Sequence, residues 1–105
     1  MPPIVDAQVH VWLPESAARP WPAGGRQWRE AGHRAEQMDE AVLLREMGEA
    51  GVDRAVLVPP LFEGHRNDYA LEVAAARPGS FRVMARLDLR EKDAVPEVVD
   101  RMVTD

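Results

Sequence analysis

Three short apolar runs separated by stretches of helical periodicity most limit what this chain can fold into. The runs cover residues 4–11, 54–58 and 81–87, and none of them contains glycine or proline, as expected of β-strands. The resulting order is strand, helix, strand, helix, strand, helix, which implies a parallel sheet with right-handed crossovers. At 105 residues the chain is long enough for one compact domain. We therefore predict a single α/β domain over residues 1–105.

Local signals mark the expected helices. Asp39 can cap a helix start through its carboxylate, and Gly51 can end that helix in a left-handed turn with Val52 packed against it. Asn67 is the matching candidate cap for a helix that would begin at Asp68. Apolar residues at spacings of three and four support these two helices and a third one near residue 100: Val42, Leu43, Met47 and Ala50; Leu71, Ala74 and Ala75; Val95, Val98, Val99 and Met102.

The first strand has one apolar and one polar side, because successive side chains of a strand point to opposite faces. The small apolar face, which we expect to pack under helices, comprises Val5, Ala7, Val9 and Val11. The opposite face comprises Ile4, Asp6, Gln8 and His10. Buried polar groups require partners, so this row indicates either a functional face or the solvated face of an edge strand. The pattern alone leaves both interpretations open.

Residues 13–37 show no usable period and are predicted to form a long loop. Proline and glycine recur through its first half, while Trp21 and Trp28 indicate that parts of the segment pack on something. A loop of this length is either a lid over a site or a loose linker. His33, within the same segment, is expected to be exposed.

Composition excludes several classes of function. The net charge is −5 and there is no basic block, which argues against nucleic acid and anionic membranes as partners. No window is apolar enough to span a membrane, and the N-terminus lacks the layout of a signal peptide. The chain has no cysteine and three histidines, so a metal would need imidazole, carboxylate or water ligands. We expect a cytoplasmic protein.

Ligands of parallel α/β proteins bind at the carboxyl ends of the strands. In the first strand this edge would present Gln8, His10 and Trp12. An inward-facing imidazole there can bind a metal or act as a general acid–base, so His10 is the strongest candidate. The alternative is a structural histidine bonded to a backbone carbonyl. Asp6 could hold a neighbouring side chain or fix a histidine tautomer, and Gln8 could hydrogen-bond a substrate.

The other two strands would bring cationic groups to the same edge. His65 and Arg66 lie in the loop 59–66 and could bind a carboxylate, although a solvated surface turn is the alternative. Arg86 lies at the end of the third strand, followed by Asp88. If Arg86 faces inward, it must pair with an anion or with Asp6 or Asp88.

These stretches together resemble a known family. Ile-Val-Asp-Ala-Gln-Val-His-Val-Trp at 4–12, followed by Gly-Val-Asp-Arg-Ala-Val-Leu-Val-Pro at 51–59, resembles the opening of amidohydrolase-related proteins. These form the amidohydrolase-2 group of metal-dependent hydrolases with a TIM-barrel fold. Glu-Gly-His-Arg-Asn-Asp at 63–68 and Val-Met-Ala-Arg-Leu-Asp at 83–88 are similar to that group's second loop and third strand. The resemblance covers nearly the whole chain and implies the first three strand–helix units of a barrel.

The resemblance also implies roles for individual residues. The family carries an Asp-x-His-x-His motif whose histidines hold a divalent metal, often zinc. Asp6 and His10 match this motif and would be catalytic, with His10 as the metal ligand, but Gln8 stands at the first histidine position and puts metal binding in question. Members act on carboxylated substrates, which implies substrate-binding roles for the remaining candidates at this edge: Gln8, Trp12, His65, Arg66 and Arg86.

Length sets the expected completeness of the fold. A barrel of eight units needs about 250 residues, so we expect an incomplete, N-terminal piece of a hydrolase or lactonase that is inactive by itself. A decarboxylase on the same scaffold is the nearest alternative. A non-catalytic half-barrel that associates with itself through open sheet edges is the alternative from another class.

Overall fold

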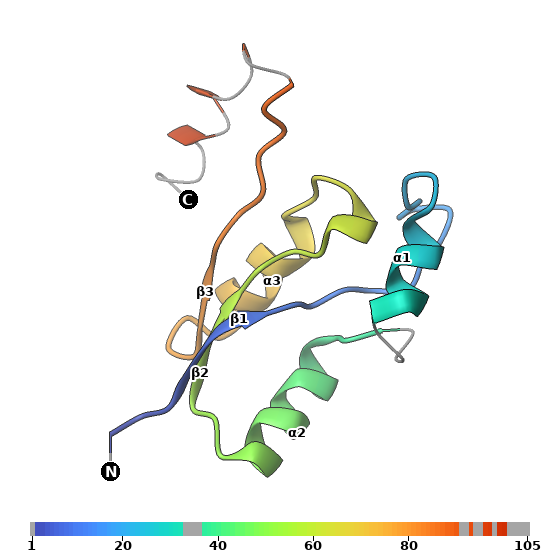
Figure 1. Cartoon of the computed structure of the whole chain (residues 1–105). Helices are drawn as coiled ribbons and strands as arrows, with labels where there is room; N and C mark the ends of the chain where they lie inside the picture. Colours follow the sequence, from blue (N-terminus) through green and yellow to red (C-terminus); the bar gives the residue numbers. More distant parts are fainter. Residues whose placement is uncertain (1, 33–36, 91–92, 94–95, 98, 101–105) are drawn as a thin grey trace.

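The computed structural model describes residues 2–32, 37–90, 93, 96–97 and 99–100. Val95, Val98 and Met102 of the expected third helix lie outside the described residues, as does His33, whereas residues 96, 97, 99 and 100 have helical backbone. The elements in chain order (Figure 1) are β1 (Val5–Val9), α1 (Gly25–Gly32), α2 (Glu40–Ala50), β2 (Arg54–Leu57), the short 3-10 helix η1 (Leu61–Glu63), α3 (Asp68–Ala76) and β3 (Phe81–Val83).

The three strands form one parallel sheet in the order β1-β2-β3, which confirms the predicted α/β class. Asp6 lies opposite Ala55 and Val9 opposite Leu57, so one extra residue of β1 is accommodated in a bulge between the two pairs. On the other side Leu57 pairs with Val83. Within the described residues β1 and β3 are therefore both edge strands.

The strands are shorter than predicted, and the end of β2 explains why. The last ladder bonds are donated by the Val58 amide to the Val9 carbonyl, at 2.7 Å, and by the Met84 amide to the Leu57 carbonyl, at 2.9 Å. The next two residues of the central strand are Pro59 and Pro60, which have no amide hydrogen to donate. Both neighbouring strands lose their partner here, so neither β1 nor β3 extends to the predicted residues 11 and 87.

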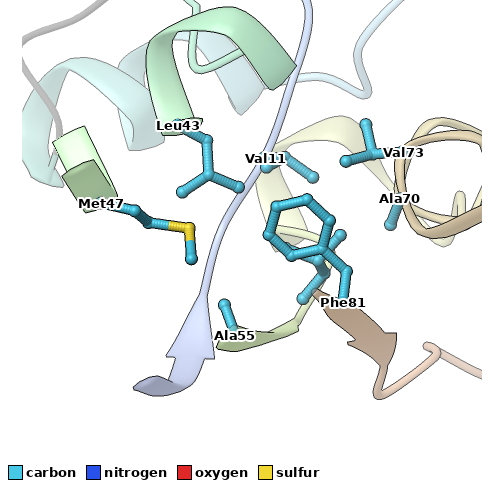
Figure 2. Close-up of a cluster of buried hydrophobic side chains, with 8 residues drawn as sticks. Val11, Leu43, Met47, Ala55, Ala70, Val73 and Phe81 are labelled. Carbon is cyan, nitrogen blue, oxygen red and sulfur yellow. The ribbon is translucent and has the colours of Figure 1, made fainter. Parts of the chain in front are cut away.

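The core lies on one face of the sheet. Figure 2 shows the central cluster, in which α2 and α3 pack over the strands. Leu57 is fully buried at 0% exposure and Phe81 at 1%. The buried residues of this cluster are Val11, Leu43, Met47, Ala55, Leu57, Ala70, Val73 and Phe81. Five separate segments thus share one core.

The predicted apolar face of β1 is confirmed only at its carboxyl end. Val11 is buried and Val9 packs against the core, but Val5 is 51% exposed and Ala7 is exposed as well. The bulge between Asp6 and Val9 breaks the strict alternation of sides. The expectation of a wholly covered apolar face is therefore wrong for the first half of the strand.

The ends of α2 are as predicted. Asp39 Oδ1 accepts the amide hydrogen of Val42 at 2.9 Å. At the other end Gly51 has φ +74°, and the Val52 amide donates to the Met47 carbonyl at 2.9 Å, which is the Schellman bond. Because no Cβ opposes a left-handed turn in glycine, the chain can reverse there without strain.

Two details of α3 differ from prediction. Asn67 precedes the helix, but its side chain makes no capping bond and contacts the segment after β3 instead. The buried face is formed by Ala70 and Val73, whereas Leu71 is 45% exposed. A one-position error of this kind arises because the alanine-rich sequence of α3 is apolar on several sides.

The predicted loop 13–37 contains a helix, so that prediction is wrong for residues 25–32. The buried side of α1 is not its apolar side: its buried residues are Gly25 and Arg29, while Trp28 is 52% exposed. It is positioned by its contact with η1. None of the helices in the described part of the chain is long and apolar enough to cross a membrane.

Candidate functional site at the carboxyl edge of the sheet

The central feature of this edge is the dipeptide Val58–Pro59, which continues β2 beyond its last ladder bond. Its two carbonyl groups hold one cationic or ionisable side chain each. His10 Nδ1 lies 2.7 Å from the Val58 carbonyl oxygen, and Arg86 Nη1 lies 3.5 Å from the Pro59 carbonyl oxygen. Successive carbonyls of an extended chain point to opposite sides. His10 and Arg86 therefore flank the end of β2 from the β1 side and the β3 side, respectively.

The contact with Val58 fixes the tautomer of neutral His10. A carbonyl oxygen only accepts hydrogen bonds, so Nδ1 carries the proton and the lone pair of the neutral ring lies on Nε2. This is the bond expected of a structural histidine. The same kind of bond also orients histidines that bind metals or transfer protons. The half-buried position of His10 is compatible with both uses.

The backbone of Arg86 is held by the side chain of Asn67. Asn67 donates to the Arg86 carbonyl at 2.9 Å and accepts the Arg86 amide hydrogen at 2.7 Å. Within the described residues no carboxylate pairs with the Arg86 guanidinium, and its Nε is buried without a hydrogen-bond partner. The expected pairing with Asp88 is not found, because Asp88 forms a two-point ion pair with Arg90 at 2.9 and 3.0 Å. That pairing lowers the pKa of Asp88 to about 2.

The other candidates on β1 and just beyond it differ in environment. Asp6 and Gln8 are exposed, and Asp6 Oδ1 accepts the Gln8 amide hydrogen at 3.1 Å. Trp12 is only 2% exposed. Its backbone forms an antiparallel bridge with Met38, and its ring packs edge-on against Phe62 with centroids 5.2 Å apart. Trp12 is thus a buried packing residue in this arrangement, while Asp6 and Gln8 face solvent.

His65 and Arg66 lie on the connection between β2 and α3. His65 is exposed. Arg66 is partly exposed and donates to Asp68 Oδ2 at 2.8 Å. A second arginine, Arg19, reaches the same carboxylate oxygen at 3.0 Å from the segment after β1.

Arg19 belongs to a network that the sequence did not indicate. Its Nη2 lies 2.9 Å from Glu63 Oε2, and the two side chains are only 16% and 5% exposed, respectively. Its guanidinium carbon also lies 5.9 Å from the centre of the Tyr69 ring. Glu63 and Arg19 are separated by 44 residues. No local spacing could have connected them, and a lone arginine in an irregular segment carries no signal of its own.

The two carboxylates that share Arg19 respond in opposite directions. Burial raises the pKa of Glu63 and outweighs the hydrogen bond from Arg19. For Asp68, burial acts in the same upward direction, but hydrogen bonds from Arg66 and Arg19 outweigh it and lower its pKa to about 2. The difference follows from exposure, since the Asp68 side chain is 53% exposed and its charge remains solvated.

The donor groups around His10 limit what metal site the described residues could form. Among the described residues, no group of three or more histidine, cysteine, aspartate or glutamate side chains is placed to hold a metal ion. His10 is oriented as metal-binding histidines commonly are, but Gln8 is exposed and offers an uncharged amide. The described residues therefore do not by themselves make a complete site for a divalent cation.

Comparisons with known proteins bear on the fold. No protein-family model matches this chain, and no curated protein matches it. Among solved structures, it is similar to a probable 2-pyrone-4,6-dicarboxylic acid hydrolase of Acinetobacter baumannii with citric acid bound. The TM-score is 0.62 at 19% sequence identity, over 81% of this chain and 29% of that one. The chain thus spans less than a third of that protein's length, and its architecture is that of part of a TIM barrel.

Proposed function

We propose that this chain forms three strand–helix units of a cytoplasmic barrel hydrolase that acts on small carboxylated molecules. The observation that carries the proposal is the pair of side chains around Val58–Pro59. Arg86 has a buried Nε without a partner among the described residues, and His10 is fixed in one neutral tautomer on the other side of the same dipeptide. A guanidinium fork matches a carboxylate geometrically, so a carboxylated ligand would supply what Arg86 lacks.

The similar protein supports this class of ligand. That protein is a probable dicarboxylic acid hydrolase, and its crystal structure contains citric acid. For this chain we assign carboxylate binding to Arg86, with Arg66 and His65 contacting a second acidic group. Gln8 would hydrogen-bond the substrate, and Trp12 would support the site from beneath.

His10 would provide the acid–base chemistry. With Nδ1 held by the Val58 carbonyl, Nε2 can take a proton from a water molecule that attacks an acyl carbon of the substrate. The imidazolium formed can then return this proton to the leaving oxygen as the C–O bond breaks. Asp6, which is also on β1, would orient water or substrate. A divalent metal on His10 would require further ligands, and no step here depends on one.

Citrate binding tests the proposal at Arg86. Removing a charge-assisted bond in a half-buried site costs about 1.5–3 kcal/mol, so Arg86→Gln should weaken citrate binding about tenfold or more in titration calorimetry. Arg45→Gln is the matched control, because Arg45 is an exposed arginine on α2. Equal affinities for the Arg86 and Arg45 variants would contradict the carboxylate role.

Hydrolysis of a lactone dicarboxylate tests His10. A general acid–base contributes about 10²–10⁴-fold to the rate, and within a complete barrel that contains these three units His10→Gln should lower kcat by a factor in this range. Citrate affinity should change little, because Arg86 remains in place. Unchanged turnover in the His10 variant would remove this histidine from the mechanism.

A second candidate function is supported by the exposed first half of β1. Ile4 and Val5 are 54% and 51% exposed on an edge strand whose backbone can accept another strand. We propose a second copy of this chain as the partner. Val5→Lys should then shift the species seen by sedimentation velocity toward monomer, and a monomeric wild-type chain with a sharp cooperative thermal transition would contradict it.

A further inference from the structure

A strap formed by residues 13–24 leaves the end of β1 and crosses to the connection between β2 and α3. Its backbone–backbone hydrogen bonds lie within the strap or run to the adjoining helix α1: Ser16 and Arg19 bond each other, while Pro22 accepts from Gly25 and Gly24 accepts from Trp28. Among the described residues, none of these bonds joins the strap to the sheet, α2 or α3. Side-chain contacts therefore hold the strap against η1 and α3. These contacts determine whether the strap lies on η1 or moves away from it.

The first contact is aromatic. Phe62 of η1 lies between Trp12, at a centroid distance of 5.2 Å, and Trp21 of the strap, at 5.1 Å. The packing around this aromatic contact is close. Pro22 lies against Gly64, and a Cβ at Gly25 would come closer than 3.0 Å to the Phe62 carbonyl oxygen. This contact is apolar and is favoured whenever the strap lies down on η1.

The second contact is ionic, and its favourable and unfavourable contributions to the free energy nearly cancel. Arg19 bonds Glu63 at 2.9 Å and Asp68 at 3.0 Å, while its own Nε is buried without a partner. Closing the strap removes Arg19 and Glu63 from water, and their mutual attraction roughly offsets that cost. If one partner is removed, the other remains buried as an uncompensated charge. The ion pair thus permits closure without strongly enforcing it.

From this geometry we propose that Arg19 is a positioning residue that latches the strap onto Glu63 and Asp68. The strap opens as a unit when the latch is broken, while the sheet, α2 and α3 stay folded. The core cluster contains no residue of the strap, so opening leaves the core intact. The latch is independent of the hydrolase proposal, since it needs neither His10 nor Arg86.

Hydrogen–deuterium exchange measured by mass spectrometry on peptides of the whole chain tests the latch. In Arg19→Gln, the amides of residues 16–28 should exchange at least about tenfold faster than in the wild type, because local opening exposes them. Exchange over α2 should be unchanged. Arg26→Gln is the control, since Arg26 is 66% exposed and lies 3.6 Å from Glu15 within the same region.

A double substitution distinguishes a latch from two separate stabilising residues. Glu63→Gln should accelerate the same amides as Arg19→Gln, and the double variant should exchange more slowly than either single variant, because removing both charges leaves no uncompensated charge buried. Additive effects would overturn the proposal. So would equal acceleration over residues 16–28 and α2, which would mean that Arg19 supports the whole fold, and so would an Arg26→Gln effect as large as that of Arg19→Gln.

Discussion

Replacing glycine by alanine at two helical positions should change stability in opposite directions. Gly25 is the first residue of α1, and a Cβ there would lie closer than 3.0 Å to the Phe62 carbonyl oxygen and 3.1 Å from the Trp21 Cβ. The overlap is with backbone, which cannot rotate away. Gly48 lies inside α2, where an added Cβ would meet nothing within 4 Å.

The magnitudes follow from these surroundings. Gly48→Ala should raise the free energy of unfolding by about 0.5–1 kcal/mol, because alanine loses less backbone entropy in a helix. Gly25→Ala should lower it by about 1–3 kcal/mol, the usual cost of forcing an extra methyl group into a packed contact. The two variants should therefore differ by about 1.5–4 kcal/mol.

Urea unfolding followed by tryptophan fluorescence measures this difference, since Trp21 lies beside the altered contact. The two midpoints should lie on either side of the wild-type midpoint. If Gly25→Ala proved as stable as Gly48→Ala, α1 would not be docked on η1 as described, and the strap contacts would have to be reconsidered.

Three further changes have defined outcomes. Leu57→Ala, at a position with 0% exposure, should lower the free energy of unfolding by about 2–5 kcal/mol in urea titration, and an unchanged midpoint would contradict its place in the core. Asp39→Ala should cost about 1 kcal/mol by removing the cap on Val42, seen as an earlier loss of helical circular dichroism on heating. The pKa of Asp68 is lowered from 3.8 to about 2, so its carboxylate stabilises the fold above pH 4, and this contribution is lost as the pH falls from about 4 to about 2. Asp68→Asn should remove that part of the acid dependence and cost about 1 kcal/mol at pH 7, because the half-exposed side chain is screened by solvent; an unaltered acid profile would refute the assignment.

Local chemistry made much of the fold predictable. The caps of α2 depend on residues within a few positions of each other, so Asp39 and Gly51 could be read directly. The parallel α/β class followed from the order of elements. The length of each strand could not be predicted from the order of elements. β3 ends where β2 reaches Pro59, and Pro59 is 24 residues earlier in the sequence than Val83.

The candidate site was predictable in position and less so in detail. The carboxyl-edge rule placed His10 and Arg86 together, and the structure has them on either side of Val58–Pro59. The sequence could not show that Asp88 would pair with Arg90 and leave Arg86 without a carboxylate. Their roles in binding and catalysis stay predictions.

The sequence by itself determined the element order, the helix ends of α2 and the edge at which polar groups collect, because these depend on neighbours along the chain. Only the tertiary structure decided that residues 25–32 are helical, that Trp12 is buried and that Arg19 meets Glu63. Each of these depends on a surface supplied by η1 or its surroundings, from residues far away in the sequence. Such contacts leave no periodic pattern in the sequence. They stabilise the protein only after folding has brought the distant segments together.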